Sequence, residues 1–120
     1  MQKILLCILF SGIASSVWAS CDNASNSVEI RECLNAESKI VERRLAQTYK
    51  TVLATHNNDT QYKQLIIQAQ REWVKFKEAD CKAQAYIFQG GSGYGISYLA
   101  CVNEYAKQRE NTLRKEFLGR

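Results

Sequence analysis

The sequence predicts an all-α domain, either an antiparallel three-helix bundle or a helical hairpin with one further helix, stapled by two disulfides. The chain has 120 residues and no Pro, and from Ser20 to Gln89 it also has no Gly, so long helices can run without a break. Apolar residues recur at three-to-four spacing through three segments, which is typical of amphipathic helices. Four cysteines follow residue 20, an even number that suggests two disulfides in a small exported domain.

Residues 1–19 are predicted to be a secretory signal peptide. Lys3 supplies the positive start, residues 4–10 are apolar, and Ala19 is a small residue after which cleavage can occur. The apolar run is too short for a spanning helix, and no later stretch is long and apolar enough to cross a membrane. We therefore expect a periplasmic protein whose residues 20–120 form one helical domain. Lipidation at Cys21 is not expected, because Trp18 stands where an aliphatic residue is usual.

The charge of the mature chain is mildly positive. Among charged residues, removing residues 1–19 takes away only Lys3, which leaves 15 basic and 12 acidic side chains and a net charge of +3. The basic pairs are interleaved with acids and form no stripe, so nucleic-acid binding is not expected.

The first helix is expected to start near residues 25–27 and to end before a polar loop at residues 55–60. Asn26 followed by Glu29 has the spacing of a helix cap and its acidic partner. The apolar stripe repeats every three to four residues. Its members are Ile30, Leu34, Val41, Leu45, Thr48 and Val52.

The second helix is expected from Asp59 or Thr60, as cap, towards Phe88, and the third after a cluster of glycines. The stripe of the second helix is Tyr62, Ile66, Ala69, Trp73, Phe76, Asp80, Ala83 and Ile87. The stripe of the third helix is Ile96, Leu99, Val102, Ala106, Arg109, Leu113 and Phe117. The segment Gly90–Gly95 between them is interpreted as a loop with Tyr94 as its exposed tip.

Cysteine spacing favours one of the three possible pairings. Cys81 and Cys101 lie at nearly equal distances from the centre of the glycine cluster, so they face each other in an antiparallel hairpin. Cys21 precedes the first helix and Cys33 lies about two turns inside it, so the N-terminal arm can fold back to reach it. The spacing favours Cys21–Cys33 and Cys81–Cys101, but the sequence alone does not choose.

A Cys81–Cys101 pair sets the register of the hairpin and brings Trp73 opposite Arg109 and Phe76 opposite Ala106. In the same register Leu65 meets Phe117. We expect Trp73 and Phe76 in the core. Arg109 is expected to pass Trp73 with its charged head in water or over the indole ring. Asp80 is expected to bond a backbone amide or a side chain of the first helix.

Residues for catalysis are scarce. His56 falls in the polar loop without metal ligands at suitable spacing, so we interpret it as an exposed loop histidine. No serine has the setting of a nucleophile, and the cysteines are expected to be oxidised. The Gly90–Gly95 segment lacks both the preceding strand and the following Lys-Ser/Thr of a phosphate-binding loop. We expect no enzyme activity, no cofactor and no metal.

Several motifs resemble one known family. They are Cys21-Asp-Asn-Ala with Glu29 and Glu32-Cys33, Ala69-Gln-Arg-Glu-Trp73, Ala79-Asp-Cys81, Gly90-Gly-Ser92, and Cys101 with Arg109-x-x-x-Leu113. In this order they are similar to the LprI-like lysozyme inhibitor family of small exported bacterial proteins, over nearly the whole mature chain. The resemblance implies a helical, disulfide-bonded protein and, as function, inhibition of lysozyme.

Two functions follow as hypotheses. In the first, the chain is a proteinaceous lysozyme inhibitor that plugs the carboxylate-bearing cleft of the enzyme with the Gly90–Gly95 loop. Its candidate binding residues are Ser92, Tyr94, Trp73 and Arg109. In the second, it is a non-catalytic periplasmic adaptor or structural protein that binds another envelope component. Charge weighs against the first, because animal lysozymes are usually basic and a +3 chain is not steered towards them.

Overall fold

The computed structural model describes residues 21–119. It contains three long helices, α1 (Ser27–Thr55), α2 (Thr60–Ala85) and α3 (Ser92–Leu113). A 3₁₀ turn, η2 (Tyr86–Phe88), extends α2, and a π-helical turn, η3 (Arg114–Leu118), extends α3. The predicted all-α class is confirmed, and residues 21–119 hold no strand. The predicted signal peptide and its cleavage after Ala19 lie outside the described residues.

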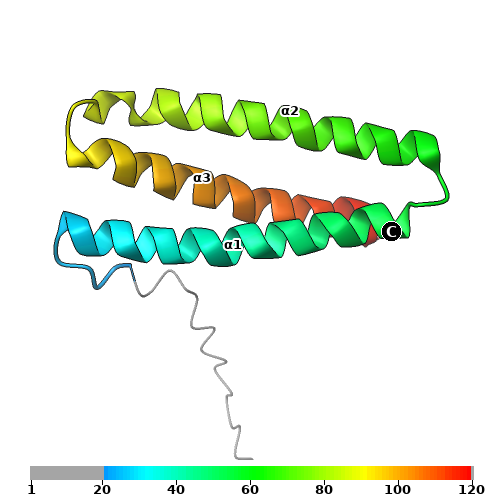
Figure 1. Ribbon diagram of the computed structural model, residues 1–120, viewed down its shortest axis with the longest axis horizontal. Coiled ribbons are helices and arrows are strands. Elements are labelled where there is room, and N and C mark those ends of the chain that lie inside the picture. Colours follow the sequence, from blue (N-terminus) through cyan, green and yellow to red (C-terminus); the bar gives the residue numbers. More distant parts are fainter. Residues whose placement is uncertain (1–20, 120) are drawn as a thin grey trace, which may run out of the picture.

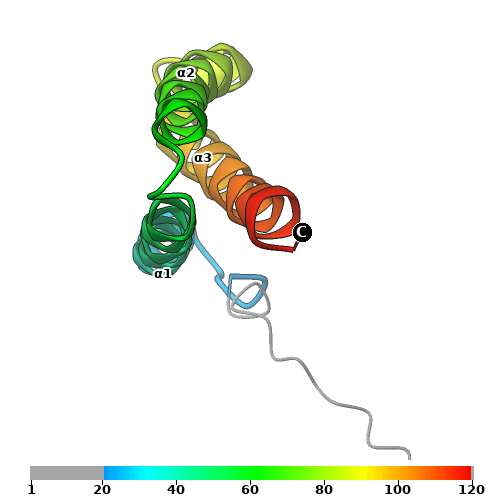
Figure 2. The ribbon, with the colours of Figure 1, turned by 90° about the vertical axis from the view of Figure 1, so that its right-hand side faces the viewer.

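The helices are arranged with α3 in the middle (Figures 1 and 2). α2 runs antiparallel to the other two, and α3 packs against both α1 and α2. α1 and α2 touch each other hardly at all. The chain is therefore a helical hairpin, α2–α3, with α1 added along the other side of α3, rather than a closed bundle. The turn between α2 and α3 lies at the same end of the molecule as the start of α1 (Figure 1).

Both helix starts in the first half of the chain follow the predicted capping pattern. The Asn26 side chain accepts a hydrogen bond from Glu29 N at 2.9 Å, and Asp59 accepts one from Tyr62 N at 3.0 Å. The Glu29 carboxylate in turn accepts hydrogen bonds from the amide and hydroxyl of Ser25. These bonds lower the pKa of Glu29, because they favour its charged form.

The core lies between α1 and α3, with a smaller contribution from α2. The predicted stripe of α1 is buried from Leu34 to Val52, and it meets Ala106 and Leu113 of α3. From α2 only Ile66, Cys81 and Ala85 are buried. α2 needs one buried face only, because it has one neighbour.

The predicted stripe of α2 is wrong in its second half. Phe76, expected opposite Ala106, is 61% exposed, and Ile87 is 80% exposed. Leu65, expected against Phe117, is 62% exposed. The physical reason is that α2 buries the face with Ile66, Cys81 and Ala85, with Cys81 bonded to α3. Because α1 does not cover α2 either, Phe76, Ile87 and Leu65 stay open to solvent.

A layer of polar contacts sets the register of α1 against α3. The buried Asn103 donates from Nδ2 to Leu34 O at 3.1 Å and accepts from the Ser38 hydroxyl. One turn further along α3, Lys107 pairs with Glu37, whose side chain is 3% exposed. These groups are satisfied only in one alignment of the two helices, so a slip along the axis would leave buried polar atoms without partners.

Both favoured disulfides are present. Cys21 is bonded to Cys33 with Cα atoms 5.5 Å apart, and Cys81 to Cys101 with Cα atoms 5.6 Å apart. The first ties the N-terminal arm to α1, and the second ties the end of α2 to α3.

Candidate functional site

The turn between α2 and α3 is shorter than the predicted loop. α3 already begins at Ser92, so Gly93 and Gly95 are helical, and only Gln89, Gly90 and Gly91 form the connection. Gly90 has φ +89°, a left-handed conformation that favours glycine. Because residues 89–91 reverse the chain, Gly93 and Gly95 lie inside the helix, and the expected Gly90–Gly95 loop is corrected to a three-residue turn.

Three large apolar side chains project just before this turn. Tyr86 is 66% exposed, Ile87 80% and Phe88 47%. We call residues 86–92 the tip. The ring of Phe88 lies against α3, where a Cβ at Gly93 would come within 3.1 Å of it. The Phe88 carbonyl also accepts from Gly91 N at 3.2 Å. The tip is therefore a turn that is packed against α3 and that exposes apolar side chains. The sequence signal for it was the run Tyr-Ile-Phe shortly before Gly-Gly.

Of the predicted loop residues, Ser92 is exposed and Tyr94 is not at the tip. The Ser92 carbonyl accepts from Arg31 Nη2 of α1 at 3.4 Å, which connects the tip to α1. Tyr94 is half-buried in the first turn of α3. Its ring lies parallel to that of Tyr98, with centroids 6.5 Å apart. Its prediction as the exposed end of a loop is wrong, because the helix starts two residues earlier.

The expected pairing of Trp73 with Arg109 is also absent. Trp73 packs against the core, and the cation over its ring is Lys77, with Nζ 4.9 Å from the centroid. Arg109 donates from Nε to Gln70 Oε1 at 2.9 Å, while its Nη2 is buried without a hydrogen-bond partner. Burial lowers the pKa of Arg109. The Nη2 atom of Arg109 is thus enclosed by the protein instead of lying in water, and the predicted role of Trp73 and Arg109 in binding stays a prediction.

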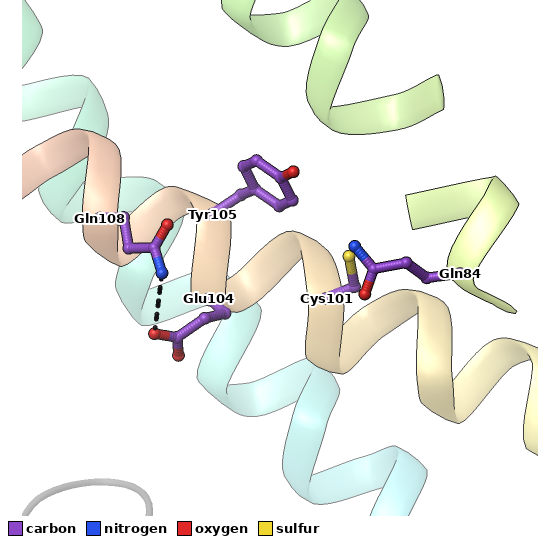
Figure 3. Close-up of a pocket in the computed structure, with 5 residues that line it drawn as sticks. All are labelled: Gln84, Cys101, Glu104, Tyr105 and Gln108. Atoms are coloured by element: carbon purple, nitrogen blue, oxygen red, sulfur yellow. Dashed lines mark hydrogen bonds between the residues drawn. The ribbon is translucent and has the colours of Figure 1, made fainter. Parts of the chain in front are cut away.

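A shallow pocket of about 260 Å³ opens between α2 and α3, beside the Cys81–Cys101 disulfide. Figure 3 shows its walls, which carry two amides, one carboxylate, one phenol and one sulfur. They are Gln84 from α2 and Cys101, Glu104, Tyr105 and Gln108 from α3.

Asp80 fixes two of these walls. Its carboxylate accepts from Gln84 Nε2 at 2.9 Å and from the Tyr105 hydroxyl. Asp80 was expected to bond a backbone amide or α1, and this is wrong because the side chain faces α3. The hydrogen bond to Asp80 raises the pKa of Tyr105, since it stabilises the protonated phenol.

His56 lies in the loop between α1 and α2 and makes contacts with other parts of the chain. Its Nε2 donates to Phe117 O at 2.8 Å, and its ring meets Tyr62 edge-on at a centroid distance of 4.7 Å. It is half-buried, so its interpretation as exposed is corrected. Within residues 21–119 no three His, Cys, Asp or Glu side chains gather as a metal site. Over the same residues, no helix has the length and hydrophobicity to cross a bilayer.

Comparison with known proteins now assigns a family. The family model described as lysozyme inhibitor LprI matches residues 19–113. The chain belongs to the LprI lysozyme inhibitor family. It is also similar to an uncharacterised protein of Rhizobium meliloti (strain 1021), with 21% identity over 94% of this chain and 89% of the relative. No solved structure matches significantly.

The match to the LprI family spans every part of the structure that positions the tip and the pocket. It includes both disulfides, the whole of α1 and α2, and α3 to its last residue. The description of the family model names a lysozyme inhibitor. Membership of the family gives the class of protein but does not identify the residues that bind a partner.

The bond between Tyr105 and Asp80 has a measurable consequence. We expect one of the six tyrosines to deprotonate above the ordinary pKa of 10.0 when phenolate absorbance is followed to high pH. Because the folded-state pKa of Tyr105 is raised, its contribution to stability is present below pH 10 and disappears as the pH rises through the folded-state pKa. Tyr105→Phe should remove the late component, and Asp80→Asn should move it earlier. A late component that persists in Tyr105→Phe would show that another tyrosine produces it.

Proposed function

We propose that this LprI-family protein inhibits a lysozyme by docking its tip on the enzyme. The observation that carries the proposal is the exposure of Tyr86, Ile87 and Phe88 at a turn that a disulfide holds against α3. The family supports lysozyme as the partner. The proposed activity needs no catalytic residue in the chain, because an inhibitor acts by occupying a surface of the enzyme.

The physical case rests on exposure and rigidity together. Covering large apolar side chains that are exposed to water lowers the free energy, so it favours binding of a partner. Tyrosine is also among the common anchors of interfaces. Cys81 lies five residues before Tyr86 and is bonded to Cys101, so the tip is tethered to α3. A tethered tip gives up less conformational entropy on binding than a free loop. Ser92, which is exposed beside the apolar groups, adds a hydroxyl to the same surface.

The proposed location is the periplasm, after removal of residues 1–19. An oxidising compartment suits the two disulfides. It is also where an inhibitor must be to meet a lysozyme that attacks the cell wall.

The test is inhibition of lysis by tip variants. We expect the oxidised chain to slow lysis of a cell-wall suspension by a c-type lysozyme in a dose-dependent way. Tyr86→Ser with Ile87→Ser should raise the concentration for half-inhibition about thirtyfold, the effect of losing roughly 2 kcal/mol at an interface hot spot. Tyr94→Ala should have a smaller effect, because Tyr94 is half-buried behind the tip.

The matched control is Leu65→Ser, which removes an apolar side chain that is 62% exposed near the start of α2, at the end of the helix away from the tip. It should leave inhibition unchanged, and all variants should keep the helical circular dichroism of the parent. Absence of inhibition at large molar excess would remove c-type lysozyme as the target and favour the envelope-adaptor hypothesis. Inhibition that survives the tip substitutions would move the site elsewhere on the molecule.

A further inference from the structure

We propose that the pocket between α2 and α3 receives an arginine side chain of the bound lysozyme, an inference that rests on the proposed function. It deepens that function by adding a second, polar anchor beside the apolar tip.

The walls offer acceptors to a planar cation. Glu104 supplies a carboxylate, and Gln108 Nε2 donates to it at 3.4 Å. Gln84 uses its own Nε2 to bond Asp80. With both amide nitrogens engaged, each glutamine has its Oε1 oxygen available as an acceptor. Carboxylate and amide oxygens around one opening match the several donors that a guanidinium carries in one plane.

Tyr105 adds an aromatic wall. Its hydroxyl is held by Asp80, so the ring is fixed in the side of the pocket (Figure 3). A guanidinium can lie against such a ring and gain a cation–π contact, which a compact ammonium does less well. The Asp80 carboxylate adds a negative charge in contact with two of the lining residues, Tyr105 and Gln84. Arginine therefore fits this pocket better than lysine.

The basic residues of the chain itself do not fill the site. The five lining residues include no lysine or arginine. The volume of about 260 Å³ also exceeds by far the roughly 10–15 Å³ that one water needs, so a side-chain head group can enter.

The pocket is continuous with the proposed interface. Phe76, Asp80 and Gln84 follow one another at a spacing of four residues, so they share one face of α2, and Ile87 follows in η2. Phe76 and Ile87, at 61% and 80% exposure, thus stand on either side of the polar groups. Apolar anchors around a polar recess are the arrangement expected of a protein interface.

This arrangement answers the objection from charge. A mature chain of +3 gains no steering towards a basic enzyme, yet a local carboxylate beside the tip pairs with one positive side chain at short range. The positive net charges of the two proteins then slow their association at long range, while the pocket stabilises the docked complex.

Glu104→Gln tests the pocket with little change of shape. We expect the dissociation constant for c-type lysozyme, measured by calorimetry, to rise about fivefold, as for loss of one partly exposed charge pair. The rise should shrink as salt is raised from low to physiological concentration, since screening weakens the same pair in the parent. Glu42→Gln, at an exposed position on α1, is the matched control and should leave binding unchanged.

A second measurement does not depend on lysozyme. N-acetyl-arginine amide, titrated into the ¹⁵N-labelled chain, should shift the side-chain amide signals of Gln84 and Gln108 in the parent and much less in Glu104→Gln. The lysine analogue should shift them less than the arginine analogue.

The outcomes separate the two proposals. If lysozyme binds the parent and Glu104→Gln equally at every salt concentration, the pocket inference is overturned while the proposed function stands. If lysozyme does not bind at all, the proposed function fails, and with it the assignment of the arginine to lysozyme. In that case arginine-selective shifts would preserve the guanidinium chemistry of the pocket, and their absence would overturn it as well.

Discussion

Lys107→Met should lower the free energy of unfolding by about 3–5 kcal/mol, the cost of leaving a buried charge without its partner. Glu37 is 2% exposed, and Lys107 is the cation that pairs with it across the α1–α3 interface. Methionine preserves most of the apolar stem of lysine, so the loss reports the charge rather than a cavity. The measurement is urea denaturation followed by circular dichroism.

The double variant Glu37→Gln with Lys107→Met separates charge from packing. Because glutamine fills the same space without a charge, the double variant should be more stable than Lys107→Met alone. Lys39→Met, at an exposed position on α1, should change the stability by no more than about 0.5 kcal/mol. Equal losses in the single and double variants would mean that the ion pair is not what Lys107 contributes.

Local signals in the sequence predicted most of the fold correctly. Asn26 and Asp59 cap their helices as expected, because a cap depends on residues three positions away. The Cys81–Cys101 pair also follows from short-range geometry, since a tight turn places residues at equal distances from it side by side. The stripe of α1 was right because α3 covers that face along its length.

The prediction failed where it depended on which helix covers which. The apolar periodicity placed Phe76 and Ile87 on one face of the second predicted helix. It did not indicate that α1 leaves this face uncovered. The pairing of Arg109 with Gln70, instead of Trp73, rests on a difference of one helical turn that no spacing rule resolves.

The candidate site shows the same division. The position of the tip next to the glycine cluster was predicted, whereas its exposed residue was not. Tyr94 was chosen because glycines on both sides suggested a loop, yet residues 89–91 make the reversal, and Gly93 and Gly95 lie in α3. The pocket was missed entirely, since the contact between Asp80 and Tyr105 joins residues 25 positions apart.

Replacing both Cys81 and Cys101 by alanine should cost about 3 kcal/mol of stability and also impair inhibition. The bond closes a segment of 20 residues, for which the entropy of the unfolded chain predicts a loss of that size. This disulfide matters more for stability here than in a closed bundle. The reason is that α2 packs mainly against α3, and Cys81 is one of the three buried side chains of α2. Denaturation with urea gives the first quantity and the lysis assay gives the second.

The other disulfide supplies the control for function. Cys21→Ala with Cys33→Ala removes a bond across 12 residues within the N-terminal arm and α1, a bond that does not tether α2 to α3. It should lower stability by a comparable amount and leave the potency of inhibition unchanged at temperatures where the domain stays folded. If the tip acts because it is tethered, the two double variants will be alike in stability and different in inhibition. If both lose potency equally, general stability and not tethering of the tip governs inhibition, and the rigidity argument fails.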